Sequence, residues 1–200
     1  MLIQAIVLGL LAQAPGSTRW TFDKDPYGAI ADGFSNEAGK WVVVSERAGK
    51  GVLMQTAGSP STVFNLALAA KPRPKDLELT VSLHAIAGKE DQGGGLVWRA
   101  RDASNYYVTR YNPLEDNFRL YKVVAGKRTQ LATADVKLPP GWHKLTVRME
   151  GDHITCSLDG KVLLNVRDST FPDAGKVGLW TKADARTEFD DLLLVEPAGG

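Results

Sequence analysis

The sequence predicts an all-β fold in which two antiparallel sheets pack as a sandwich or jelly roll. Apolar and polar residues alternate with a period of two from Trp41 onward, which is typical of strands with one buried face. Turn residues interrupt these segments about every ten residues, which divides the chain into roughly a dozen short strands. No segment after the N-terminal residues shows a sustained helical period, so a parallel α/β fold, which needs crossover helices, is excluded.

The alternation also locates individual strands. Residues 77–84 and 144–150 alternate without interruption, and both are predicted to have one buried face and one wet face. Residues 153–158 and 161–166 follow the same pattern and are separated by Asp159-Gly160. This dipeptide predicts a tight hairpin turn between two paired strands.

A single domain is expected, because 200 residues are enough for one good-sized core and no interdomain linker is visible. An apolar run ending in Ala12-Gln13-Ala14 is typical of a secretory signal, which predicts a secreted or periplasmic protein. No membrane span is expected after cleavage, and an uncleaved anchor is the alternative. The predicted divisions are a signal peptide at 1–14, a short linker at 15–19, a jelly-roll domain at 20–196 and a tail at 197–200.

The charge balance excludes a dedicated nucleic-acid binder. The chain has 24 Lys and Arg against 23 Asp and Glu, so no summed positive field concentrates a polyanion. Cys156 is the single cysteine and cannot form an internal disulfide. Because it alternates with Ile154 and Leu158, it is predicted to be a buried structural thiol. The sequence leaves the oligomeric state open.

Several catalytic motifs are excluded by their context. Gly93-Gly94-Gly95 enters a strand and not a helix, so it lacks the helix N-terminus that a phosphate loop needs. A bulge or a close approach to a neighbouring strand is predicted there instead. His84, His143 and His153 lack the spacing of zinc ligands, and no Gly-x-Ser-x-Gly elbow of a serine hydrolase is present.

Tryptophan, tyrosine and arginine are concentrated in 96–101 and 105–113, which are predicted to be adjacent strands joined near 102–105. Because large amphipathic groups occur on both faces, we expect one face to be core and the other a concave polar surface. Aromatic rings pack on sugar C–H faces and arginine bonds paired hydroxyls. Ordinary cross-strand aromatic and cation–π packing is the alternative. The candidate carbohydrate contacts are Trp98, Arg99, Arg101, Tyr107, Arg110, Tyr111, Arg119, Tyr121 and Trp180.

The β-sandwich glucanases carry their catalytic carboxylates on one strand face as Glu-x-Asp-x-Glu. The nearest match begins at Glu188 and has Leu192 in its third position, so that catalytic strand is absent. Asp190, Glu115 and Asp116 are the candidates for an acid or base acting on a glycosidic bond. Further acidic residues near strand ends, such as Asp91 and Asp102, are candidates to bind calcium, to hold arginines or to be solvated.

Three stretches together, 91–132, 141–164 and 171–194, resemble the concanavalin-like jelly rolls. They are most similar to the bacterial domains called 3-keto-disaccharide hydrolase domains, which are related to glycoside hydrolase family sixteen, with laminin-G-like domains as distant kin. The resemblance covers the chain from about Trp20 to Val195. It implies two packed antiparallel sheets, one of them curved, with glycans bound on the concave face or along its rim.

The function predicted from the sequence is carbohydrate recognition by an exported jelly-roll domain. One alternative is a glycoside hydrolase or lyase that acts on 3-keto-disaccharides with a carboxylate acid or base. A second alternative is a laminin-G-like interaction module with calcium as a candidate ligand. No other cofactor is indicated, and no metal ligands are assigned.

Overall fold

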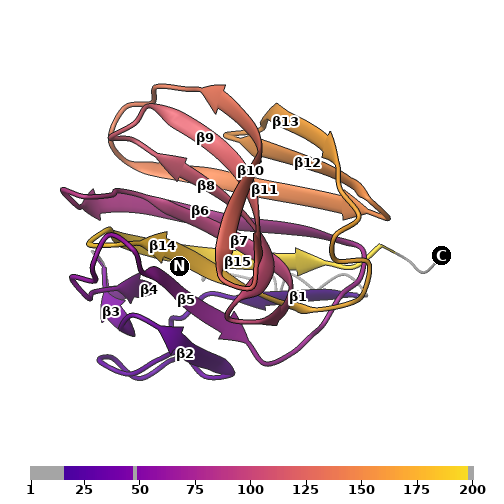
Figure 1. Cartoon of the computed structure of the whole chain (residues 1–200). Coiled ribbons are helices and arrows are strands. Elements are labelled where there is room, and N and C mark those ends of the chain that lie inside the picture. Colours follow the sequence, from indigo (N-terminus) through magenta and orange to yellow (C-terminus); the bar gives the residue numbers. More distant parts are fainter. Residues whose placement is uncertain (1–15, 47–48, 198–200) are drawn as a thin grey trace, which may run out of the picture.

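The computed structural model describes residues 16–46 and 49–197 and confirms the predicted all-β class (Figure 1). Two antiparallel sheets form a jelly-roll sandwich, and the described residues contain strands β1 to β15 and no α-helix. Among these residues no helix is long and apolar enough to cross a membrane. The predicted signal peptide at 1–14 lies outside the described residues.

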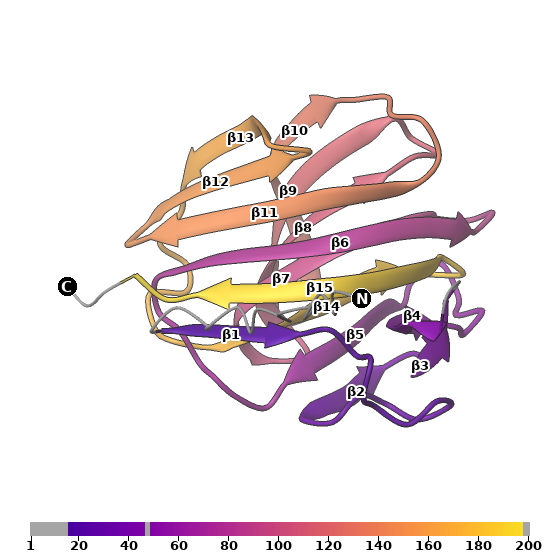
Figure 2. The ribbon, with the colours of Figure 1, turned by 180° about the vertical axis from the view of Figure 1, so that it is seen from behind.

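The eight-stranded sheet has the order β13-β12-β11-β6-β15-β4-β3, with β1 added beside β15. Figure 2 shows β11, β6 and β15 running side by side across this sheet. One edge of β15 pairs first with β4 and then, near its end, with β1. The strands are β1 (Ser17–Trp20), β3 (Trp41–Ser45), β4 (Gly51–Gln55), β6 (Leu77–Ala87), β11 (Trp142–Glu150), β12 (His153–Leu158), β13 (Lys161–Arg167) and β15 (Arg186–Val195).

The seven-stranded sheet has the order β10-β9-β8-β7-β14-β5-β2. Strands β7 to β10 follow one another in the chain and pair in sequence, whereas β14 joins them to β5 and β2 from a distant part of the chain. The strands are β2 (Phe34–Ala38), β5 (Phe64–Ala69), β7 (Gly94–Asp102), β8 (Asn105–Asn112), β9 (Asn117–Val124), β10 (Lys127–Asp135) and β14 (Lys176–Lys182).

The two hairpins predicted from the sequence are confirmed. Asp159 and Gly160 have φ values of 49° and 79° and connect β12 to β13, as a tight turn with two left-handed residues requires. Asp102 pairs with Asn105, so β7 and β8 are adjacent and joined where expected.

The first strand begins earlier than expected. Ser17–Trp20 pairs with β15, with Ser17 opposite Val195 and Trp20 opposite Leu192. Residues 17–19 therefore belong to the eight-stranded sheet and not to the linker expected at 15–19. Four residues are too few for alternation to mark a strand, because their pairing depends on a partner far away in the sequence.

The inner faces of the two sheets form one core. Leu79, Val81, Leu145 and Val147 alternate inward from β6 and β11, and each is fully buried. Cys156 packs in the same core, and burial raises its pKa to about 12. The predicted structural thiol is thus confirmed, because a thiol held in its neutral form is a poor nucleophile.

The seven-stranded sheet also buries side chains on its outer face. Leu66, Val97 and Val108 form a second apolar cluster there, although the residues that the structure describes include no further layer over them. The sheet must curl to achieve this: Arg128 on β10 lies 5.2 Å from the ring centroid of Phe64 on β5, five strand positions away. In a flat sheet those strands would be roughly 24 Å apart. The outer face is therefore concave, and side chains from distant strands cover one another.

Close strand approach at Gly95 is required for this packing and gives a first prediction. A Cβ atom at Gly95 would lie 1.8 Å from the carbonyl oxygen of Thr109 on β8. We expect Gly95→Ala to lower the free energy of unfolding by about 1–3 kcal/mol, because the backbone must shift to accept the methyl group. Urea unfolding followed by circular dichroism measures the free energy of unfolding of the variant and the wild type. Gly58→Ala is the control, since nothing lies within 4 Å of its Cβ position; equal stability of the two variants would contradict the prediction.

Candidate functional site

Trp98 and Tyr107, two of the predicted carbohydrate contacts, lie in the core between the sheets. They are cross-strand neighbours whose rings stack with centroids 5.6 Å apart. The indole nitrogen of Trp98 donates a hydrogen bond to the Met149 sulfur (3.1 Å), and the Tyr107 hydroxyl donates to the Asp168 carboxylate (2.6 Å). Burial raises the pKa of Tyr107 to about 12. Both rings are therefore occupied by contacts within the core.

Arg99 and Arg101 lie where β7 departs from regular strand geometry. Arg99 has a φ of 46°, and the register with β8 shifts at this point, so simple alternation fails here. Arg101 pairs with Asp173 and lies 5.3 Å from the ring centroid of Phe171. The guanidinium of Arg99 is buried, and four groups accept its hydrogen bonds: the carbonyls of Lys75, Gly151 and Phe171 and the carboxylate of Asp76.

The other large predicted contacts gather on the concave outer face of the seven-stranded sheet. We call this surface the aromatic face and define it by its rings and arginines: Phe64, Tyr106, Tyr121, Trp180, Arg110, Arg119 and Arg128. Sequence reasoning named Arg110, Arg119, Tyr121 and Trp180 of this set. It missed Phe64, Tyr106 and Arg128. Alternation already placed Tyr106 on the same side as Arg110, but no local pattern indicated Phe64 or Arg128.

The rings of the aromatic face are held in place by one another. The ring centroids of Phe64 and Trp180 are 5.5 Å apart, and the Trp180 indole nitrogen donates a hydrogen bond to the Tyr106 hydroxyl (3.2 Å). Arg128 lies over this group, with its guanidinium carbon 4.3 Å from the Tyr121 ring centroid. Phe64 and Arg128 are partly exposed, whereas Tyr106 and Trp180 are buried beneath them. The surface thus presents a rigid ring next to a cation.

A carboxylate near the end of this face receives three donors on one of its oxygens, Oε2. Glu115, in the β8–β9 turn, accepts hydrogen bonds from Arg110 (2.8 Å), Arg119 (3.1 Å) and Asn117 (3.0 Å). Partial burial disfavours its charge, but the bonds from Asn117 and Arg110 outweigh this effect and lower the pKa of Glu115. Glu115 is therefore an ionised acceptor that fixes two arginines.

A second carboxylate, Asp91, is buried at the same end of the face. Its Oδ1 accepts a hydrogen bond from Asn112 (2.8 Å), and its Oδ2 lies 3.4 Å from the Lys182 ammonium. Burial raises the pKa of Asp91, although Arg110 and Lys182 favour the charged form. Because only 5% of its side chain is exposed, Asp91 supports the turn and does not reach a surface ligand.

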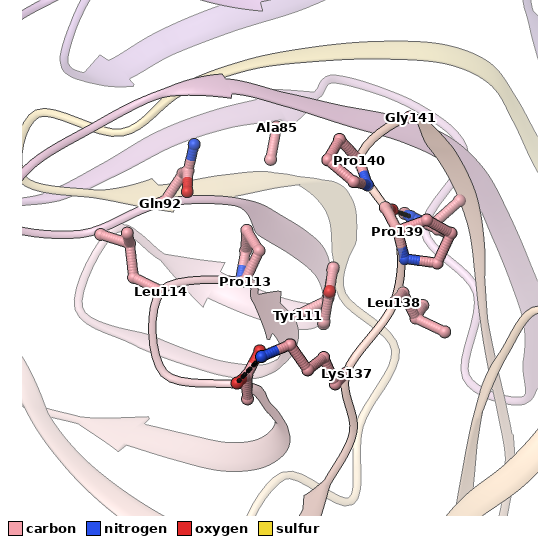
Figure 3. A pocket seen from close by; sticks show the side chains of 12 residues that line it. Ala85, Gln92, Tyr111, Pro113, Leu114, Lys137, Leu138, Pro139, Pro140 and Gly141 are labelled. Atoms are coloured by element: carbon pink, nitrogen blue, oxygen red, sulfur yellow. Dashed lines mark hydrogen bonds and ion pairs between the residues drawn. The ribbon is translucent and has the colours of Figure 1, made fainter.

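Tyr111 and Asp116 lie instead at a cavity of about 500 Å³ at one end of the sandwich (Figure 3). Pro113 and Leu114 line one side of it, and residues 137–141 line the other. Lys137, labelled in Figure 3, forms an ion pair with Asp116, and the charged atoms are 3.4 Å apart. The β8–β9 turn thus separates the two surfaces, because Glu115 contacts the aromatic face while its neighbour lines this end cavity.

Asp190 lies on the other sheet, on the outer side of β15 opposite Ser82. Burial raises its pKa to about 6, and the charges of Asp191 and Asp23 act in the same direction. Its Oδ1 accepts a hydrogen bond from the Asp191 backbone nitrogen (2.6 Å). The charge of Asp190 is therefore disfavoured in the folded protein.

The three predicted catalytic carboxylates do not converge on one surface. Asp190 belongs to the eight-stranded sheet, Glu115 bonds the arginines of the aromatic face, and Asp116 pairs with Lys137 at the end cavity. Residues 16–46 and 49–197 contain no group of three or more His, Cys, Asp or Glu side chains placed to hold a metal ion.

Comparison with solved structures finds the same fold at low sequence identity. The carbohydrate binding module CBM66 from Bacillus subtilis aligns with a TM-score of 0.69 and 20% identity over 82% of this chain and 96% of that chain. A mutant of the GH43 protein BlXynB from Bacillus licheniformis aligns with a TM-score of 0.65 and 14% identity, over 89% of this chain but 39% of that one.

A further similar structure is the exoplasmic/lumenal domain of VIP36 in its Ca2+/Man-bound form, with a TM-score of 0.58 and 15% identity over 84% of this chain and 83% of that chain. No family model matches the chain. A search of curated proteins finds no significant match. At these identities the structural likeness establishes the fold alone.

The environment of Asp190 predicts a pH-dependent effect on stability. Its folded-state pKa of about 6 lies above the ordinary value of 3.8, so its ionisation destabilises the fold as the pH rises through that range. Asn cannot ionise. We therefore expect the stability of Asp190→Asn, relative to the wild type, to increase between about pH 4 and pH 7 and then to level off.

Urea unfolding of both proteins at several pH values measures this difference. Glu90→Gln serves as the control, because Glu90 is exposed. A stability difference between Asp190→Asn and the wild type that does not change with pH would refute the assignment.

Proposed function

We propose that this chain is a carbohydrate-binding jelly-roll domain and that its ligand lies on the aromatic face. The observation that carries the proposal is the placement of Arg128 and Phe64, from opposite parts of the curved sheet, around the rings of Tyr121 and Trp180. A sugar ring presents apolar C–H groups on one side and hydroxyls around its edge. The face offers partners for both.

The accessible groups of the face have complementary roles. Phe64, which is partly exposed, supplies a ring for C–H contacts, while Arg119, with 31% of its side chain exposed, supplies N–H donors at the rim. The buried Trp180 packs against Phe64, and Glu115 and Tyr121 accept hydrogen bonds from Arg119, so both groups are held in position. A preorganised surface loses little side-chain entropy on binding, which favours affinity for a weakly bound ligand such as a sugar.

Two of the proteins with a similar fold are described as binding a carbohydrate, which supports the proposal. One is a carbohydrate binding module and another carries mannose in the form described as Ca2+/Man-bound. Export through the predicted signal at 1–14 is part of the same proposal, because it would bring the domain to glycans outside the cell. Calcium binding by this chain stays a prediction.

The chemistry of the aromatic face favours binding over hydrolysis. Two-carboxylate hydrolysis needs one group free to protonate the leaving oxygen and another facing the same bond. On this face Glu115 is engaged by three donors, and Asp91 is buried against Lys182. A hydrolase or lyase of 3-keto-disaccharides stays the alternative function, and turnover of such a substrate that is lost in Asp190→Asn or Glu115→Gln would establish it.

Binding and its location are tested together with a glycan array followed by isothermal titration calorimetry. We expect Phe64→Ala to weaken the affinity for the retained glycan about tenfold, because it removes an accessible ring that packs on the sugar. Trp142→Ala is the matched control: this indole is 37% exposed on the opposite sheet. Its removal should leave the affinity unchanged.

A further variant separates the aromatic face from the end cavity. Leu114 is 52% exposed at that cavity, so Leu114→Ala should not change the affinity if the glycan lies on the aromatic face. Loss of binding in Leu114→Ala with no change in Phe64→Ala would move the site to the cavity. Absence of any retained glycan on the array would remove the proposed function itself.

A further inference from the structure

The cations of the aromatic face differ in whether they have a counter-ion. Arg110 and Arg119 share the carboxylate of Glu115. Lys182, at the end of the same face, lies 3.4 Å from Asp91. For Arg128, in contrast, no carboxylate or other hydrogen-bond acceptor is found among residues 16–46 and 49–197. Arg128 is thus the cation of this surface whose charge is unmatched.

Aromatic rings surround Arg128 where a counter-ion would be expected. Its guanidinium carbon lies 4.3 Å from the Tyr121 ring centroid, 5.2 Å from that of Phe64 and 5.8 Å from that of Trp180. Its Nη1 atom is buried and lacks an acceptor. Ring faces attract a cation but do not accept its N–H groups as the oxygen of a charge-assisted hydrogen bond does. The guanidinium is therefore positioned but electrostatically incomplete.

The position of Arg128 makes the remaining donors available to a ligand. It lies on β10, the edge strand of the sheet, and its side chain is partly exposed. A planar guanidinium offers paired N–H groups that fit the two oxygens of a carboxylate or a sulfate. An acidic sugar can place such an oxyanion against Arg128 while its C–H face packs on the neighbouring Phe64 ring.

We propose that the aromatic face selects glycans that carry an oxyanion substituent, a uronate carboxylate or a sulfate, and that Arg128 binds this group. The inference rests on the proposed function, because it specifies the ligand class of the same face. A neutral sugar would leave the Arg128 charge without a partner. An acidic sugar provides an acceptor for the accessible N–H groups of Arg128, whose side chain is partly exposed.

The test uses the full chain and pairs of glycans that differ in charge alone: uronate against neutral, and sulfated against unsulfated, each with the same length and linkage. An array identifies the retained pair, and calorimetry measures both affinities at low and moderate salt. We expect the acidic member to bind at least about tenfold more tightly, which is the scale of a charge-assisted hydrogen bond. This preference should shrink as salt increases. The pair that shows the preference, uronate against neutral or sulfated against unsulfated, decides between carboxylate and sulfate.

Variants then assign the preference to Arg128. Arg128→Gln should reduce the ratio of acidic to neutral affinity toward one, and Arg128→Lys should retain part of it, because the charge remains without the planar fork. Arg167→Gln is the control, since Arg167 pairs with Asp152 at the eight-stranded sheet and should change neither affinity. Thermal unfolding confirms that each variant is folded. If Arg128→Gln does not fold, the comparison of Arg128→Lys with the wild type carries the test.

The outcomes separate this inference from the function on which it rests. Equal affinity for acidic and neutral members overturns the inference while leaving carbohydrate binding in place. A charge preference that Arg128→Gln and Arg128→Lys both retain also overturns the inference. If these variants change only the melting temperature, Arg128 stabilises the curved sheet and does not bind the ligand. If no member of any pair binds, the proposed function fails as well.

Discussion

The curvature of the seven-stranded sheet is the constraint on which the rest of the structure depends. This sheet buries aromatic side chains on both faces, with Trp98 and Tyr107 facing the core and Tyr106 and Trp180 facing outward. A flat sheet would leave the outward rings in water, at a cost of about 25 cal/mol for each square ångström of apolar surface. Curling brings the distant strands β10 and β5 toward each other across this face, so its side chains cover one another.

The same curvature explains which parts of the site could be predicted from the sequence. Alternation correctly placed Tyr106 and Arg110 on one side of β8 and Tyr107 on the other, because the two-residue period is local. It could not say which side is concave, since both carry rings. The bulge at Arg99 reverses the expected orientation within β7, and the contact of Arg128 depends on curvature accumulated over five strand intervals. Neither the bulge at Arg99 nor the contact of Arg128 leaves a signal in the residues next to it in the sequence.

The carboxylates show how sheet assignment limits catalytic interpretation. From the sequence, Asp190 and Glu115 are both candidate catalytic carboxylates, Asp190 on the last long strand and Glu115 at the hairpin after Tyr111. The fold assigns them to different sheets, and it gives them opposite electrostatic environments: burial raises the pKa of Asp190, whereas donors lower that of Glu115. Opposite shifts mark an acid and a base when two groups face one bond. Here the shifts are separate consequences of packing, because no single bond can lie between them.

Two arginines of the seven-stranded sheet, the buried Arg99 and the partly exposed Arg128, show the difference between a structural and a functional cation. Arg99 has every side of its guanidinium satisfied by carbonyls and a carboxylate, and it joins three segments of chain. Arg128 is held by ring faces instead, which orient it without neutralising it. A saturated charge has nothing left to offer a ligand. The incomplete one keeps donors in a fixed direction at the surface, which is what recognition of an anionic group on a sugar requires.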